Sequence, residues 1–335
     1  MSTGVAASGR GALAALFSGG LAIGLAPIFV RLSELPPAAT AFWRLAFAVP
    51  VLTVWMLLEQ RAGEPASRVS DAARPSGAPA LPAVVHPAIL WRDGAGLLLA
   101  GGCFAADLAV WHWSLRYTSV ANATLLPNFA PLFVTLGGWW LFRERVSWLF
   151  MLAMGVAFAG AAVLMGESFH LGPETLWGDA LGLGTSVFYA GYILAVGRLR
   201  ARFSTAVIMV WSGAVSAGVL LVVAVASGEN LLASSLSGWL TLLGLALISH
   251  AGGQSLIAYA LAHLPAAFSS LGLLIQPAAA AVLAWPLLGE VLRVQQGVGA
   301  AIILAGIFLA RWGNPPAGEA SSRLRQSSTG DPAAP

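Results

Sequence analysis

Lysine is absent from this 335-residue chain, and its 17 basic residues, all arginine, are accompanied by only 14 acidic ones. Charged residues make up 9% of the sequence, whereas a typical soluble domain has about a quarter. Hydrophobic residues reach 58%, so there is too little polar surface to enclose a water-soluble core of this size. This balance excludes an ordinary soluble protein and indicates an integral membrane protein.

Cysteine and the common catalytic motifs are also scarce. The single Cys103 excludes a disulfide framework within the chain. No GxxxxGK[ST] phosphate loop occurs, so direct ATP-driven pumping is unsupported, and HExxH, GxSxG and close His/Cys clusters are absent too. The arginines flank apolar runs instead of forming a basic surface. We therefore expect no cofactor, no metal site and no nucleic-acid partner.

Long apolar runs are what the sequence has instead. A bilayer core of about 30 Å needs roughly 20 apolar residues per helix. Ten runs fit this length, at residues 11–30, 37–58, 94–115, 119–141, 146–165, 178–197, 204–226, 238–260, 265–287 and 294–310. The stretch 59–92 is rich in Ala, Pro and Ser and is predicted to be a flexible loop without a fold of its own. The predicted fold class is an all-α integral membrane protein with ten transmembrane helices.

The arginines predict the orientation of these spans. If the N-terminus is cytoplasmic, all arginines lie at cytoplasmic ends except Arg31, Arg116, Arg293 and the intramembrane Arg44. The positive-inside rule therefore places both termini on the cytoplasmic side of the cell (inner) membrane. A signal peptide at residues 1–30 is the alternative, but the first run has a counterpart later in the chain.

That counterpart belongs to an internal repeat. PLFVTLGGWWLFRE (131–144) and PAAAAVLAWPLLGE (277–290) share the spacing of Pro and Glu, and Ala159-Gly160 matches Ala305-Gly306 at the same offset. Each copy has five spans, and because five is odd, the second copy enters the membrane from the opposite side. Inverted repeats are typical of secondary transporters, which bind substrate between the halves near the midplane. Chance similarity between apolar segments is the alternative.

These residues resemble the EamA repeat of the drug/metabolite transporter superfamily. The marks are Phe42-Trp43-Arg44, Ser114-Leu115, Ala121, Leu125-Leu126, Pro131, Glu144 and Gly160, then Ala260-Leu261, Ala266, Pro277, Gly289-Glu290, Gln296, Gly299 and Gly306. The resemblance implies ten helices in two inverted five-helix repeats, and the family includes exporters of amino acids and other small metabolites. The sequence departs from the pattern at Ser212, which stands where the first half has Arg44, and in the long 59–92 loop.

The predicted organisation follows from the spans and the repeat. It consists of a cytoplasmic N-terminus (1–10), a first repeat (11–165), an external linker (166–177), a second repeat (178–310) and a disordered cytoplasmic tail (311–335).

Most spans carry a narrow polar or aromatic stripe at helical spacing. In lipid, such groups face other helices or a water-filled cavity. Alternatively, they only hold helices together, at roughly 0.6 kcal/mol per interaction. The number of spans with such stripes predicts one shared substrate-binding cavity. Its candidate residues are Arg44, Asp107, Trp111, Asn128, Tyr189, His250, Gln254 and Gln276.

Arg44 and Asp107 are charges placed well inside spans, ~10 Å and ~13 Å from the outer ends at the helical rise per residue. A lone buried charge costs at least ~2.5 kcal/mol, so pairing or a wet cavity is expected. A pair of this kind suits the carboxylate and ammonium groups of a zwitterion. Alternatively, the Arg44 side chain extends to the outer headgroups and its role is structural.

Together these features predict a secondary transporter of a small organic solute such as an amino acid, and the resemblance implies export. An intramembrane enzyme is an alternative, with His250 and Asp107 as its only candidate pair, and a channel or scaffold is another. The expected partners are the substrate and the lipid bilayer. The fifth and tenth spans carry small residues such as Gly160 and Gly306, and a homodimer through these spans is a further interpretation left open.

Overall fold

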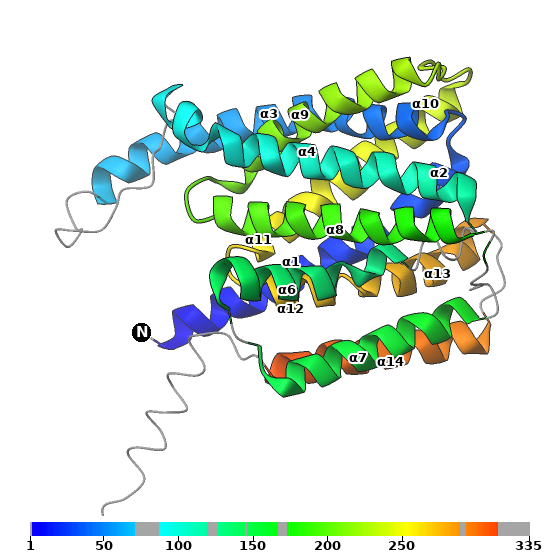
Figure 1. The fold of residues 1–335 in the computed structure, drawn as a ribbon. Coiled ribbons are helices and arrows are strands. Elements are labelled where there is room, and N and C mark those ends of the chain that lie inside the picture. The colour runs from blue at the N-terminus through cyan, green and yellow to red at the C-terminus, as the bar shows by residue number, and fades with distance from the viewer. Residues whose placement is uncertain are drawn as a thin grey trace, which may run out of the picture.

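The computed structural model of the chain is a bundle of roughly parallel and antiparallel helices (Figure 1). It describes residues 2–70, 87–118, 126–144, 146–166, 173, 175–288 and 293–313. Within these ranges there are only helices, turns and irregular segments and no strand, which agrees with the predicted all-α class. In the same ranges, 8 helices are long and apolar enough to cross a membrane, and Trp148–Leu164 is a shorter apolar helix.

In the described residues, the first half of the chain contains helices of the five expected spans, and two of these spans consist of two helical pieces. They are α1 (Ser2–Gly24) with α2 (Ala26–Leu32), α3 (Pro37–Ser70), α4 (Pro87–Tyr117), the 3₁₀ turn η2 (Leu126–Phe129) with α6 (Ala130–Phe142), and α7 (Trp148–Met165). The predicted loop 59–92 is corrected at both ends, because α3 and α4 extend into it. Helix-forming residues such as Glu59, Gln60 and Arg61 continue α3 beyond the apolar run.

The second half also forms five spans. They are α8 (Leu176–Leu199), α9 (Thr205–Ala226), α10 (Leu236–Gly244) with the π-helical η4 (Leu245–Gln254) and α11 (Ser255–Ala260), α12 (Ala266–Gly272) with α13 (Ile275–Leu288), and α14 (Val294–Gly313). Serine hydroxyls start three helices by accepting a backbone N–H of the first turn, at Ser147, Ser204 and Ser235. Several predicted parts lie outside the described residues: 71–86, 119–125, most of the 166–177 linker, Gly289-Glu290 and 314–335.

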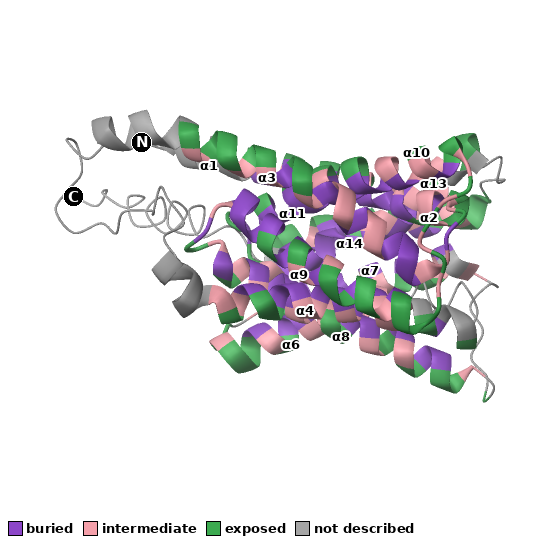
Figure 2. Ribbon diagram, turned by 90° about the horizontal axis from the view of Figure 1, so that it is seen from above, coloured by how far each residue is buried: buried purple, intermediate pink, exposed green. Residues whose placement is uncertain are grey.

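The outer surface of the bundle is apolar, as lipid requires. Figure 2 shows buried residues on the inward faces of the helices and exposed residues on their outward faces. The large exposed side chains include many tryptophans and leucines, such as Trp140 at 77% exposed and Leu236 at 75%. Such a surface would be unfavourable in water and is suited to a hydrocarbon solvent.

The two halves are interleaved in space. α3 packs along α9, α4 packs along α8 and α9, and α1 packs against η4, α11 and α13. Glycines permit the closest of these approaches: a Cβ on Gly19 would lie 2.8 Å from the Gly253 carbonyl oxygen, and one on Gly101 would lie 2.8 Å from that of Ser212. Each half therefore completes the packing of the other.

α7 and α14 form a separate pair at one edge of the bundle (Figure 1). Their backbones touch, since a Cβ on Gly160 would lie 2.6 Å from the Ile303 nitrogen and a Cβ on Gly299 would lie 2.5 Å from the Leu164 nitrogen. Small residues of this kind permit close helix packing in membranes, where van der Waals contact is a main source of association.

At one end of the bundle, a carboxylate from the first half caps a helix of the second. Glu34, in the turn before α3, accepts hydrogen bonds from the Ser235 hydroxyl and from the Ser234 hydroxyl and nitrogen, the latter two at 2.8 and 2.9 Å. These serines precede α10, whose N-terminal charge favours an anion. The bonds from Ser235 and Ser234 hold the pKa of Glu34 below its ordinary value because they stabilise the ionised form.

A second carboxylate makes the reciprocal contact. Glu229, which follows α9, accepts a hydrogen bond of 2.8 Å from the Ala39 nitrogen in the first turn of α3. At the other end of the same helix pair, Glu59 of α3 accepts a bond of 2.7 Å from the Ser204 hydroxyl at the start of α9. Side-chain bonds therefore join α3 and α9, which belong to different repeats, at both ends.

Candidate functional site

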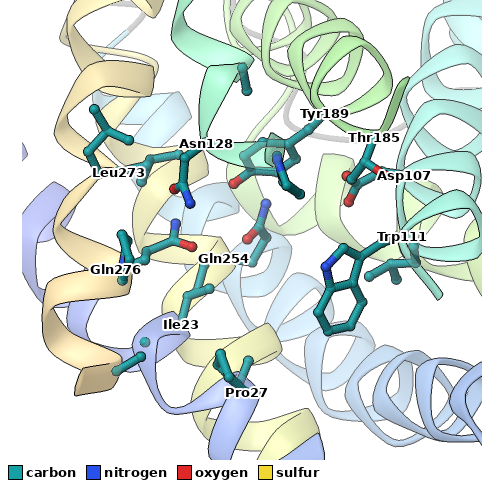
Figure 3. A pocket seen from close by; sticks show the side chains of 18 of the residues that line it. Ile23, Pro27, Asp107, Trp111, Asn128, Thr185, Tyr189, Gln254, Leu273 and Gln276 are labelled. Atoms are coloured by element: carbon teal, nitrogen blue, oxygen red, sulfur yellow. The ribbon is translucent and has the colours of Figure 1, made fainter. Parts of the chain in front are cut away.

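A cavity of about 190 Å³ lies between the two halves of the chain (Figure 3). Its lining comes from α1, α2, α3, α4, η2 and α6 of the first half and from α8, η4, α12 and α13 of the second. Among the described residues, α7, α9 and α14 contribute none of the lining. The cavity therefore belongs to both repeats and to neither alone.

Three of the spans around the cavity are interrupted beside it: α1 is followed by α2, η2 by α6, and α12 by α13. Prolines account for these breaks. Pro27, Pro131 and Pro277 lie in the first turns of α2, α6 and α13, where a missing N–H is harmless but the preceding helix cannot continue. All three prolines line the cavity. Discontinuous spans of this kind surround the substrate sites of many secondary transporters.

The structure brings seven of the eight predicted site residues to this cavity: Arg44, Asp107, Trp111, Asn128, Tyr189, Gln254 and Gln276. Figure 3 shows Asn128, Gln254 and Gln276 gathered around Tyr189, with Asp107 and Trp111 on the other side of the cavity. Polar and aromatic residues of six spans therefore converge on one cavity, and their role in substrate binding stays a prediction.

His250 is the exception and corrects the sequence-based assignment. It is buried and absent from the lining residues, and its ring packs on Phe104 with 5.5 Å between centroids. Depth along a span predicted that His250 would reach the cavity, but depth does not determine the direction of a side chain around the helix axis. Since Phe104 lines the cavity, His250 lies behind it. The pair of His250 and Asp107 considered for an intramembrane enzyme does not share this cavity.

Arg44 and Asp107 line the same cavity without a direct ion pair, since no N–O distance of 4.0 Å or less joins them in the described structure. Each side chain is 8% exposed. They are close enough to interact electrostatically, and the Arg44 Cζ lies 6.0 Å from the Phe104 ring centroid, at the limit of a cation–π contact. The cavity thus presents opposite charges at separate points.

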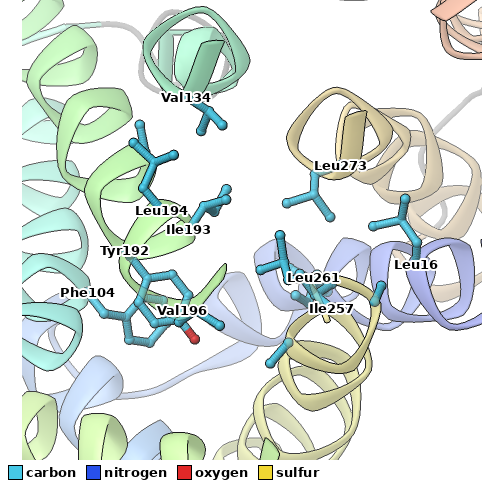
Figure 4. Close-up of a cluster of buried hydrophobic side chains, with 14 of the residues drawn as sticks. Leu16, Phe104, Val134, Tyr192, Ile193, Leu194, Val196, Ile257, Leu261 and Leu273 are labelled. Carbon is cyan, nitrogen blue, oxygen red and sulfur yellow. The ribbon is translucent and has the colours of Figure 1, made fainter. Parts of the chain in front are cut away.

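Towards the N-terminal end of the bundle, buried apolar side chains from several spans form a cluster (Figure 4). Leu16, Val196 and Leu261 each lie seven residues from the lining residues Ile23, Tyr189 and Gln254 of the same spans, which corresponds to ~10 Å along a helix. All three are buried. We call Leu16, Val134, Ile193, Val196, Ile257 and Leu261 the apolar plug.

Sequence reasoning missed the apolar part of the lining. Ile23, Pro27, Val30 and Phe104 line the cavity as well, but an apolar residue that faces a cavity looks the same in sequence as one that faces lipid. Pro27 was the available signal, because a proline inside an apolar run predicts a break in the span.

A cavity enclosed by interrupted spans of two inverted repeats defines a multi-pass membrane transporter. Comparison with known families agrees, since the EamA-like transporter family matches residues 10–166 and 176–312, one match in each half. The chain belongs to this family. It is accordingly a transporter with ten helices in two repeats, and not an enzyme.

Individual relatives are consistent with this assignment. An uncharacterized transporter of Archaeoglobus fulgidus is 24% identical over 287 residues, which is 84% of this chain and 91% of the relative. A probable terminal-alkyne amino-acid exporter of Streptantibioticus cattleyicolor is 29% identical over 223 residues, 65% of this chain and 73% of the relative. A crystal structure at 17% identity, covering 93% of this chain and 98% of its own, has a TM-score of 0.70 and shares the fold.

Proposed function

We propose that the protein exports a small amphipathic organic solute, such as an amino acid, across the cytoplasmic membrane by alternating access. The observation that carries the proposal is the cavity, which encloses charges of both signs and uncharged amides between the two halves. Its volume of about 190 Å³ is below the ~300–1,000 Å³ typical of pockets for drug-sized ligands. The size therefore favours a metabolite over a large drug, and the name of the exporter from S. cattleyicolor supports the same class.

Export as the direction of transport is supported by the name of the exporter from S. cattleyicolor, and the orientation that the arginines predict says which state the structure shows. With both termini in the cytoplasm, the apolar plug separates the cavity from the cytoplasm, and the cavity lies in the outer half of the membrane. Export then requires a second state, in which Leu16, Val196 and Leu261 separate to admit the solute from inside and the outer ends of the spans close. Both states bind the solute, and the solute crosses the membrane when the protein changes from one state to the other.

Counterflow in proteoliposomes tests this function. Vesicles loaded with unlabelled L-norvaline, L-leucine, L-phenylalanine or L-threonine should accumulate the same labelled solute from outside, and vesicles without protein should not. Uptake that saturates and is reduced by competing solute would distinguish a transporter from a channel. Folded, correctly inserted protein that exchanges none of these solutes, nor any other small organic solute in a wider screen, would contradict the proposal.

A further inference from the structure

Three cavity-lining residues have a buried nitrogen atom without a hydrogen-bond partner in the described structure: Arg44 Nε, Gln254 Nε2 and Gln276 Nε2. All three atoms are N–H donors. Arg44 is 8% exposed and Gln254 is 2% exposed, so water has little access to either side chain. A buried donor without an acceptor is unfavourable, and three in one cavity indicate that an acceptor-bearing ligand group completes the site.

These donors come from three different spans but share one neighbour. Gln254 of η4 and Gln276 of α13 both interact with the Tyr189 hydroxyl (Figure 3), but neither amide nitrogen donates a hydrogen bond of 3.5 Å or less in the described structure. Arg44 of α3 interacts with Tyr189 electrostatically. Asp107, which as a carboxylate only accepts hydrogen bonds, lies on the other side of Tyr189 from Gln276 in the same view. Donors and acceptor are thus arranged around one aromatic residue.

The backbone adds charge of the same sign to the donor side. α13 has 14 residues and begins at Ile275, next to Gln276. The N-terminus of a helix carries a partial positive charge, and interrupted spans of transporters direct such termini towards anionic substrate groups. A carboxylate supplies two acceptor oxygens and a negative charge, and so it meets the requirements of the donors and of the helix terminus together.

We propose that Arg44, Gln254 and Gln276 form a donor pole that binds the carboxylate of an α-amino acid, and that Asp107 binds its ammonium group. The inference rests on the proposed function and narrows the substrate from amphipathic solutes to zwitterions. The side chain of the amino acid then lies against the apolar wall that contains Ile23 and Pro27. Selectivity between amino acids depends on that wall, whereas recognition of amino acids as a class depends on the donor pole and Asp107.

Blocked forms of one amino acid test the two poles separately. We expect purified protein in detergent to bind L-norvaline at least about tenfold more tightly than L-norvalinamide, which lacks the carboxylate, because charge-assisted hydrogen bonds are lost. N-acetyl-L-norvaline, which lacks the ammonium group, should also bind about tenfold more weakly than L-norvaline. Dissociation constants come from the ligand-dependent rise in melting temperature.

Matched variants then assign each pole. Gln254→Met and Gln276→Met keep the length of the side chain but remove its donors, so each should weaken the binding of norvaline about tenfold. Each should weaken the binding of norvalinamide less than about twofold, because norvalinamide lacks the carboxylate that these donors bind. Asp107→Asn should remove the preference for norvaline over its N-acetyl form. Gln60→Met, outside the lining residues, should change none of the three constants.

The outcomes separate the inference from the function on which it rests. The inference is overturned if wild-type protein binds norvaline no better than its blocked forms, or if both glutamine variants weaken all three compounds equally. If counterflow of other organic solutes persists in that case, the proposed function stands and only the zwitterion poles are wrong. The two glutamine variants lie on different spans, so one remains informative if the other does not fold.

Discussion

The indole Nε1 of Trp43 donates a hydrogen bond of 2.6 Å to the carbonyl oxygen of Leu231, and this bond fastens the second span to the loop between α9 and α10. The Trp43 ring also packs edge-on against Trp239 of α10, with 5.0 Å between centroids. Together with the carboxylate caps, these contacts join the two repeats at this end of the bundle.

Trp43→Phe should therefore destabilise the protein. The variant keeps an aromatic ring but leaves the Leu231 carbonyl without its donor, a loss of about 1 kcal/mol. We expect a lower melting temperature in detergent. Trp140→Phe is the matched control, since Trp140 is 77% exposed and should tolerate the same change. Equal effects of the two substitutions would show that the Trp43 hydrogen bond contributes nothing.

The stability of the protein should depend on pH through Glu34. Its pKa is held below the ordinary value of 4.5 by hydrogen bonds from Ser235 and Ser234. A group with a lowered pKa contributes stability that is complete above pH 4.5 and is lost as the pH falls through the pKa of the folded state. The melting temperature of wild type should exceed that of Glu34→Gln at pH 7, and the difference should shrink below pH 4.5. A difference that stays constant down to pH 3.5 would contradict this assignment.

Arg44 and Asp107 should be coupled across the cavity although no ion pair joins them. Removing one charge leaves the other nearly buried without compensation, which costs more than removing both. We expect Arg44→Gln and Asp107→Asn each to reduce counterflow at least about tenfold, and the double variant to be more stable than the sum of the single losses predicts, by more than about 0.5 kcal/mol. Arg311→Gln, at the exposed end of α14, serves as the charge control. Additive stabilities would exclude the coupling, and near-normal counterflow of Arg44→Gln would show that Arg44 is a structural residue.

Gly160 should be essential for the pairing of α7 with α14. A valine at this position would place its Cβ 2.6 Å from the Ile303 nitrogen, whereas a Cβ on Gly155 of the same helix meets nothing within 4 Å. Overpacking of this kind costs about 1–3 kcal/mol. Gly160→Val should lower the melting temperature and the yield of folded protein, and Gly155→Val should do neither. If both variants behave alike, the two helices do not require this close approach. A homodimer through these spans stays a separate prediction, for cross-linking to test.

The orientation of the chain can be tested without purification. Arginine placement predicts that Ser70 is cytoplasmic and that His170, which lies outside the described residues, is external. Fusions of a reporter active only inside and of one active only outside should therefore give opposite results at the two positions. Finding both positions on one side would contradict the ten-span topology.

Some features of the site followed from sequence because lipid imposes simple rules. Apolar runs of about 20 residues identify spans, and the helical rise places Asn128 and Gln276 near the middle of theirs. Rotation about the helix axis has no comparable rule, which is why His250 was assigned to the cavity and lies behind Phe104. The capping of α10 by Glu34 could not be predicted either, because the partners are about 200 residues apart and neither segment indicates the other as its partner.

The caps made by Glu34 and Glu229 make each half of the chain depend on the other. Each carboxylate caps a helix of the other repeat. A single repeat produced alone would therefore have a carboxylate without its helix and a helix end without its carboxylate. This end of either half is thus complete only when the other half lies beside it. Joining the halves in one polypeptide keeps both partners of both caps in every molecule.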